Sequence, residues 1–269
     1  MTRIIQISDP HIVPNGQLAY GQVDTAAALA SCVKTVNRLL PEIGPVDVAI
    51  VTGDITDFGT KEEYQRFREI MEPLKLPYRA IPGNHDNVVN MRACFSDQSW
   101  MPSEGPINWT IKFNDLVLIA LDSSIAGQAH GHLSDKTLSF LSDTLELQSG
   151  LPALVALHHP PITTGIEKMD IQNLRDSAQL EAILSGYSGE LRLICGHVHR
   201  NIVASFGSII CQIAPGVSHA VSMDLQPDAP NCLTKEPGGV LLHETRAGIV
   251  THHIPTGKFA GPFLFYPEG

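Results

Sequence analysis

The sequence lacks the long apolar runs that a membrane-spanning protein needs. No part of its 269 residues approaches the ~20 consecutive apolar residues of a transmembrane helix. The first residues enter a strand pattern directly, without the apolar core of a secretory signal. Low-complexity tracts are absent as well, and a composition of 43% hydrophobic and 17% charged residues is typical of globular proteins. These features predict a folded cytoplasmic protein without a membrane partner.

Clusters of basic residues are also lacking. The chain has 18 Lys and Arg against 28 Asp and Glu, which gives a formal net charge of −10, and the basic residues are scattered. A nucleic-acid polymer needs clustered positive charge, so none is expected as a partner. Bound divalent cations can reverse the sign of the field inside one pocket, so the acidity does not exclude a small anionic substrate.

The cysteines form no CxxC pair, and their odd number argues against a disulfide framework. Free thiols packed in a reducing cytoplasm are the expected state. The five positions are Cys32, Cys94, Cys195, Cys211 and Cys232.

Short runs rich in Ile, Val and Leu alternate with helical patterns through the first two thirds of the chain. We expect Pro41 and the Gly44-Pro45 pair to end the first helix. The predicted strands are 3–8, 47–52, 78–81, a hairpin of 108–113 with 116–121, then 153–157 and 191–195. The predicted helices are 24–40, 61–71, 134–148 and 173–184.

The last third changes in character. Strands are predicted at 202–206, 208–213, 239–243 and 248–253, with short turns between them. The whole chain, 1–269, is therefore expected to form one α/β domain of two layered sheets with helices outside. Residues 223–238, rich in Pro, Asp and Asn, are expected to be a long loop or lid. The aromatic tail at 255–269 either packs on the domain or makes an oligomer contact.

Residues that can bind metals follow five of the predicted strands, each at its carboxyl end. In α/β sheets these ends line one edge, where ligands bind. Imidazole and carboxylate groups without thiolate suit Mn, Fe, Co or Zn, and fit neither a Cys-rich zinc site nor an all-oxygen calcium site. The candidate ligands are Asp9, His11, Asp54, Asn84, His158, His197 and His199.

This set is too large for one tetrahedral ion, and it suits two ions that share a bridging carboxylate. Two ions roughly 3.5–4 Å apart can clamp the attacking and leaving oxygens of a phosphoryl transfer. The sequence therefore predicts a centre of two divalent or mixed-valent transition-metal ions.

The same residues carry a family resemblance. Five blocks, in this order, are similar to the signature blocks of the calcineurin-like metallophosphoesterases and extend over residues 9–199. The blocks are Asp9-Pro10-His11, Gly53-Asp54, Gly83-Asn84-His85-Asp86, His158 and Gly196-His197-Val198-His199. The resemblance implies a four-layer α/β/β/α sandwich of two mixed β-sheets flanked by helices.

Different segments of the sequence resemble two different branches of that superfamily. Tyr20-Gly21, the segment 53–59 and Glu63-Tyr64 resemble the bacterial class III cyclic nucleotide phosphodiesterases. The segment 215–219 and the terminal 260–262 resemble the related bacterial glycerophosphodiesterase. The substrate implied is a small phosphodiester of either kind, and a homo-oligomer is the habit of the family.

The resemblance also implies roles. One ion belongs to Asp9, His11 and His199, the other to Asn84, His158 and His197, and Asp54 bridges them. His85 is left to face the phosphate, where it stabilises developing charge or protonates the departing alkoxide. Asp86 is implied to orient His85, and Asn84, His85 and His219 are implied to contact the substrate. The implied nucleophile is a metal-bound hydroxide.

Some of these residues have simpler explanations. Asn84 can cap the helix that follows, and His159 should point away from His158, toward the Pro160-Pro161 turn. Asp57 stands where purple acid phosphatases carry a tyrosine ligand to ferric iron, so that charge-transfer site is not expected.

The leading prediction is a dinuclear metal-dependent phosphodiesterase acting on a cyclic nucleotide or a glycerophosphodiester. The nearest alternative is a broad-specificity phosphomonoesterase, because the same centre serves either substrate. A nuclease and a binding scaffold without metals are the remaining alternatives. The net negative charge disfavours a nuclease. The complete set of candidate ligands disfavours a scaffold without metals.

Overall fold

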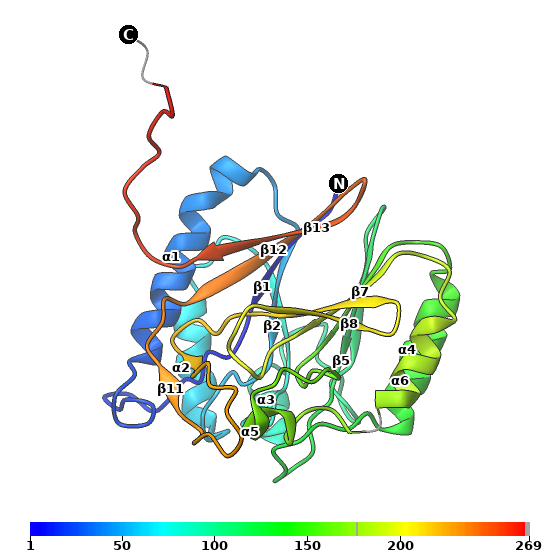
Figure 1. Ribbon diagram of the computed structural model, residues 1–269, viewed down its shortest axis with the longest axis horizontal. Coiled ribbons are helices and arrows are strands. Elements are labelled where there is room, and N and C mark those ends of the chain that lie inside the picture. Colours follow the sequence, from blue (N-terminus) through cyan, green and yellow to red (C-terminus); the bar gives the residue numbers. More distant parts are fainter. Residues whose placement is uncertain (176, 267–269) are drawn as a thin grey trace.

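The computed structural model describes residues 1–175 and 177–266 and contains two large mixed β-sheets (Figure 1). The strand order is β13-β12-β1-β2-β3 in the first sheet and β4-β5-β6-β7-β9-β8 in the second. The first sheet consists of β1 (Arg3–Ile7), β2 (Val48–Thr52), β3 (Tyr78–Ile81), β12 (Gly239–Arg246) and β13 (Gly248–Pro255). The second consists of β4 (Trp109–Lys112), β5 (Val117–Leu121), β6 (Ala153–Leu157), β7 (Leu191–Cys195), β8 (Ile202–Phe206) and β9 (Ile209–Ile213).

Helices lie outside the two sheets. The apolar core between the sheets takes side chains from both, such as Ile4 of β1 and Leu154 of β6. On one side of the molecule lie α1 (Thr25–Ile43) and α2 (Lys61–Met71), and on the other lie α4 (Asp135–Leu147) and α6 (Ser177–Ser185) (Figure 1). The short helix α3 (Val88–Cys94) contacts α2. This arrangement confirms the predicted four-layer sandwich.

The strands that matter for the site run parallel to one another. In the first sheet β1 pairs with β2 and β2 with β3, and in the second β5, β6, β7 and β9 follow in the same sense. β2, β5 and β6 are buried at every position, as strands covered on both faces should be. Because the strands of each parallel set run in the same direction, the carboxyl ends of each set lie together at one edge of its sheet.

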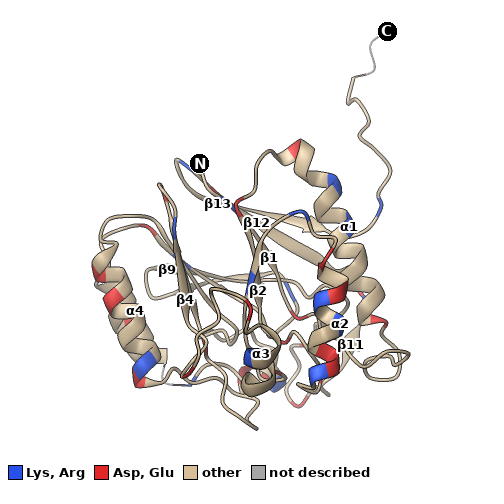
Figure 2. Ribbon diagram, turned by 180° about the vertical axis from the view of Figure 1, so that it is seen from behind, with Lys and Arg blue, Asp and Glu red and all other residues tan. Residues whose placement is uncertain are grey.

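The charged residues of the outer helices are mixed in sign. On α2 and α4, Lys and Arg lie among Asp and Glu (Figure 2). α2 begins with a capping box, in which Thr60 and Glu63 satisfy each other's backbone N–H groups. Among the described residues no helix combines the length and the apolarity needed to cross a membrane.

The first helix does not end at Pro41. It continues to Ile43, and the Gly44 N–H donates to the Leu40 carbonyl. Leu40 and Ile43 pack against the core, and this burial outweighs the loss of one helical hydrogen bond at the proline.

Several short elements were not predicted. α3 and α5 (Glu167–Asp170) are helices. β11 (Leu233–Thr234) lies inside the predicted loop 223–238 and pairs with β10 (Ala220–Val221), which lies just before it. The predicted helix 173–184 includes residue 176, which lies outside the described residues, and the observed α6 begins at Ser177.

The described part of the tail contacts the domain only at its start, where Gly257 hydrogen-bonds to Thr35 and Arg38 of α1, and residues 258–266 are exposed. It leaves β13 and runs away from the body of the molecule (Figure 1). Its large apolar side chains are exposed, Phe265 to 98% and Tyr266 to 90%. Residues 267–269 of the predicted tail lie outside the described part of the chain.

Candidate metal centre

The carboxyl ends of β1, β2, β3, β6 and β7 bring the candidate ligands together at one edge of the sandwich. Five of the candidates adopt the left-handed backbone conformation that non-glycine residues rarely use. They are Asp9 (φ 55°), His11 (φ 45°), Asp54 (φ 48°), His197 (φ 74°) and His199 (φ 55°). Such strain persists only where the surrounding structure imposes it, and it concentrates at functional sites.

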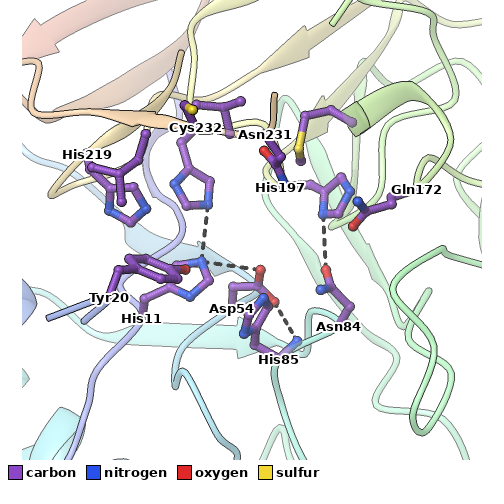
Figure 3. Close-up of a pocket in the computed structure, with 14 residues that line it drawn as sticks. His11, Tyr20, Asp54, Asn84, His85, Gln172, His197, His219, Asn231 and Cys232 are labelled. Carbon is purple, nitrogen blue, oxygen red and sulfur yellow. Dashed lines mark hydrogen bonds and ion pairs between the residues drawn. The ribbon is translucent and has the colours of Figure 1, made fainter. Parts of the chain in front are cut away.

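One group of ligand atoms gathers around His11. Its Nε2 lies 3.1 Å from His199 Nε2 and 3.4 Å from Asp54 Oδ2 (Figure 3). Asp9 Oδ1 lies 3.5 Å from the same His199 nitrogen. All four side chains are buried, and their donor atoms are close enough to share one ion.

A second group gathers around Asn84. Its Oδ1 lies 3.0 Å from His197 Nδ1 (Figure 3). The same oxygen lies 3.1 Å from His158 Nε2. Asp54 Oδ2, which faces the first group, is also 3.3 Å from His158 Nε2. One carboxylate oxygen therefore lies between the two groups.

Neighbouring carbonyl and carboxylate oxygens set the direction of the imidazoles. His158 Nδ1 lies 2.8 Å from the Thr52 carbonyl, which only accepts, so this nitrogen carries a hydrogen. His11 Nδ1 lies 3.0 Å from Asp57 Oδ1 in the same way. Each ring can then turn the lone pair of Nε2 toward the cluster, as a metal-binding histidine does.

The electrostatics of the cluster favour a bound proton on Asp9 and on His158 and a neutral ring at His197. Burial raises the pKa of Asp9 to about 6. Burial alone would lower the pKa of His158, but the carboxylates of Asp54 and Asp9 raise it to about 9. Burial, followed by the charge of His158, lowers the pKa of His197 to about 3.

The donor set fits two cations. Asp9 Oδ2 is buried without a hydrogen-bond partner, and Asn84 Oδ1, which only accepts, faces two imidazole nitrogens. Crowded acceptor atoms of this kind need protons or cations between them. Imidazole, carboxylate and amide ligands without thiolate suit a transition metal.

His85 stands at the mouth of the cluster. Its Nδ1 lies 2.9 Å from the Asp57 carbonyl, so it donates there, and its ring stands edge-on to His11. The side chain is 35% exposed, and it faces the pocket rather than the protein interior (Figure 3).

Asp86 makes no hydrogen bond with the His85 ring. Its carboxylate accepts from the backbone N–H groups of Ile55, Thr56 and Gly83 and from the Tyr64 hydroxyl. It therefore holds two ligand loops together, and the direct contact that orients His85 comes from Asp57.

His219 lies beside the first group and lines the cavity. Its ring is 4.5 Å from that of His199 and 5.4 Å from that of Tyr20. Burial, followed by the charge of His11, lowers the pKa of His219 to about 4, so the ring is neutral at pH 7. His159, which was expected to point away from His158, turns its Nδ1 to Ser123 at 2.8 Å, yet it remains close enough to His158 and His197 to share an ion with them.

A cavity of about 180 Å³ opens over the cluster. Besides the candidate ligands and His85, its wall includes side chains that were not predicted as site residues. They are Tyr20, Met169, Gln172, Val221, Asn231, Cys232 and Leu233. Tyr20 lies in a segment that the family resemblance already marked, and Asn231, Cys232 and Leu233 lie in the predicted loop or lid at 223–238. No sequence signal indicated Met169, Gln172 or Val221.

The Gly53 position has no room for a side chain. Its φ is +90°, and a Cβ there would lie 2.3 Å from His158 Nδ1 and 2.9 Å from the Gly83 nitrogen. Gly53→Ala should therefore lower the free energy of unfolding by about 2 to 4 kcal/mol, measured by urea denaturation. Gly127→Ala, at φ +74° with nothing within 4 Å, serves as the control for backbone strain alone. Equal losses in both variants would refute the steric explanation.

Two mixed sheets with His, Asp and Asn gathered at their shared edge are the features of a metallophosphoesterase. The chain belongs to the calcineurin-like phosphoesterase family, whose model matches residues 2–201. This match confirms the family predicted from the sequence.

Similar proteins extend the comparison to nearly the whole chain. A probable glycerophosphodiester phosphodiesterase from Arcobacter nitrofigilis is 40% identical over 98% of this chain and 97% of its own length. A 3',5'-cyclic adenosine monophosphate phosphodiesterase from Haemophilus influenzae is 30% identical over 84% of this chain and 78% of its own. A dimetal phosphatase from Danio rerio has a similar fold, with a TM-score of 0.68 at 14% identity, over 94% of this chain and 96% of its own. The predicted function agrees with the names of the first two proteins.

Proposed function

We propose that this protein is a phosphodiesterase that hydrolyses small phosphodiesters at a centre of two transition-metal ions. The observation that carries the proposal is the position of Asp54 Oδ2, 3.4 Å from His11 Nε2 and 3.3 Å from His158 Nε2. A single carboxylate oxygen in reach of both ligand groups is what a bridge between two ions requires. A pair of bridged ions is suited to phosphoryl transfer.

The roles that we propose follow the two groups. Asp9, His11 and His199 hold one ion, Asn84, His158 and His197 hold the other, and Asp54 bridges them. The bound ions, Mn, Fe, Co or Zn, supply activation of a water for attack and neutralisation of the phosphate charge.

The remaining steps belong to side chains. His85, anchored through Nδ1 to the Asp57 carbonyl, presents Nε2 to the phosphate and donates a proton to the departing alkoxide when its ring is charged. Asn84 and His219 position the substrate. For Asp86 the predicted role of orienting His85 is replaced by another: its carboxylate ties the Asp54 loop to the Gly83 loop.

Glycerophosphodiesters are the substrate class that we favour. The most extensive similarity above is to a protein with that name, and the amides of Gln172 and Asn231 in the cavity wall can hydrogen-bond to hydroxyl groups. Cyclic nucleotides are the second candidate, because the relative from Haemophilus influenzae is named for that substrate.

The ions should be essential for turnover. Protein stripped by a chelator and reloaded with Mn²⁺ or Co²⁺ should hydrolyse bis(p-nitrophenyl) phosphate, and the stripped form should be at least ~10³-fold slower, because metal catalysis contributes several kcal/mol. The measurement is release of p-nitrophenol, with circular dichroism to check the fold. A folded sample whose turnover does not depend on metal would end the proposal.

A panel of substrates separates the alternatives. We expect the reloaded enzyme to hydrolyse glycerophosphocholine and glycerophosphoethanolamine faster than cyclic AMP, and diesters faster than p-nitrophenyl phosphate. A preference for cyclic AMP would favour the second candidate, and a preference for the monoester would favour a phosphomonoesterase.

The wider organisation of the molecule is part of the proposal. We infer one catalytic domain over the whole chain, a lid formed by residues 223–238 and a cytoplasmic location. Asn231 and Cys232 of that segment line the cavity, which supports the lid. The exposed apolar side chains of the tail support a homo-oligomer in which a second copy covers them.

A further inference from the structure

A chain of buried polar side chains lies between the two sheets, below the metal centre. Its middle members are Gln6 of β1, 0% exposed, and His243 of β12, 1% exposed. Both lie among the apolar side chains of the core, where a polar group costs free energy unless all its hydrogen bonds are made. Packing alone does not explain why a glutamine, rather than an apolar residue, occupies this buried position.

The Gln6 amide makes every hydrogen bond that its position allows. Its Nε2 donates to the Cys195 carbonyl at 2.9 Å and to Thr52 Oγ1 at 3.0 Å, and its Oε1 lies 3.0 Å from His243 Nε2. A carbonyl oxygen only accepts, so Cys195 settles which end of the amide is the nitrogen.

The orientation of the amide then settles the neighbouring histidine. His243 must donate to Gln6 through Nε2, which leaves Nδ1 to accept from Thr251 Oγ1 at 2.8 Å. Burial lowers the pKa of His243 to about 3, in agreement with a neutral ring. These linked side chains, from Thr52 through Gln6 and His243 to Thr251, therefore have one consistent set of hydrogen-bond donors and acceptors.

The two hydrogen bonds donated by Gln6 go to residues that end strands and directly precede loops with candidate metal ligands. Cys195 is the last residue of β7, directly before Gly196 and His197, and Thr52 is the last residue of β2, directly before Gly53 and Asp54. One side chain of the first sheet thus contacts the second sheet at the point where that sheet delivers its ligands.

Thr52 extends the link to two more ligand loops. Its hydroxyl donates to Ser8 Oγ at 2.8 Å, next to Asp9, and its carbonyl accepts from His158 Nδ1 at 2.8 Å. The strand ends are also tightly packed, because a Cβ on Gly196 would lie 2.2 Å from Ser8 Oγ and 2.8 Å from the Thr52 carbonyl.

We propose that Gln6 is a positioning residue for the metal centre: its buried amide sets the spacing between the Asp54 loop of one sheet and the His197 loop of the other. This inference rests on the proposed function. An amide does not titrate, so Gln6 acts by orientation and not by proton transfer. It reaches the ligands only through Thr52 and Cys195, and for that reason no motif marks it.

The test is Gln6→Met, which removes the amide and keeps an unbranched side chain of similar length. We expect a folded protein whose Mn²⁺ affinity is about 10- to 100-fold weaker, as is typical when the groups that support metal ligands are lost. Turnover should fall at limiting Mn²⁺ and recover at saturating Mn²⁺. The exchange coupling between two bound Mn²⁺ ions, observed by electron paramagnetic resonance, should also change.

Two further variants identify the cause. Thr144→Val removes a buried hydroxyl group of α4, which donates only to the Phe140 carbonyl of the same helix. It should bind Mn²⁺ like the wild type. Gln6→Met combined with His243→Phe removes the histidine donor left unpaired by the first change, and it should remain as weak in Mn²⁺ binding as Gln6→Met alone.

The outcomes separate this inference from the proposed function. Wild-type Mn²⁺ affinity in folded Gln6→Met, or recovery of affinity in the double variant, would overturn the positioning role and leave the metal centre intact. A wild-type protein that binds fewer than two Mn²⁺ ions would overturn the proposed function itself.

Discussion

Asp54→Ala should abolish binding of at least one metal ion and lower diester turnover by about 10³-fold or more. The carboxylate oxygen in reach of both His11 and His158 is lost, and no neighbouring side chain replaces it. Several kcal/mol of charge stabilisation depend on the ions that it holds together. Isothermal titration with Mn²⁺ measures the number of sites, and hydrolysis of bis(p-nitrophenyl) phosphate measures the rate.

The matched control for this change is Asp143→Ala. Asp143 is an exposed carboxylate of α4, on the outer face of the second sheet. The Asp143→Ala variant should bind two ions and keep the wild-type rate. If Asp54→Ala retained both ions with unchanged affinity, the bridging role would be refuted.

His85→Ala should keep both ions and lower turnover by about 10²- to 10⁴-fold, the usual contribution of a general acid or base. The substitution removes the ring but keeps the backbone N–H, which donates to Asp54 Oδ1 at 2.9 Å. The bridge therefore stays in place, and the loss falls on the rate. Metal analysis of the purified variant and its kcat for the diester test the two halves of this expectation.

His253→Ala is the control for His85→Ala. His253 is an exposed residue of β13 and has no place in the cavity wall. We expect it to match the wild type in metal content and rate. Equal metal loss in His85→Ala and Asp54→Ala would contradict the division of roles between the two residues.

Much of the fold was predictable because buried parallel strands have a clear pattern. β6 is a continuous apolar run and β7 is interrupted only by Arg192, and their predicted bounds match the structure. The exceptions are elements whose stability comes from distant contacts. The last turn of α1 passes through Pro41 because Leu40 and Ile43 pack on the core, and the short strand β11 exists through its pairing with β10.

The candidate ligands were predictable because each follows a strand and so has a fixed place at the edge of the sheet. The supporting residues were not. The GNHD block placed Asp86 beside His85 in sequence, yet the Asp86 carboxylate turns to Ile55 and Thr56, and the His85 ring is held from the other side by Asp57. Neighbours in sequence do not determine which way a loop side chain points.

The sequence by itself determined the chemistry of this protein: which ligand types are present, in what order, and at the ends of which strands. The tertiary structure alone decided which atoms meet. Asp54 Oδ2 reaches both ligand groups, Gln6 joins the two sheets, and Gln172 and Asn231 reach the cavity. The physical reason is that strand pattern and residue type are local properties, whereas the direction of a buried side chain depends on how the two sheets pack against each other.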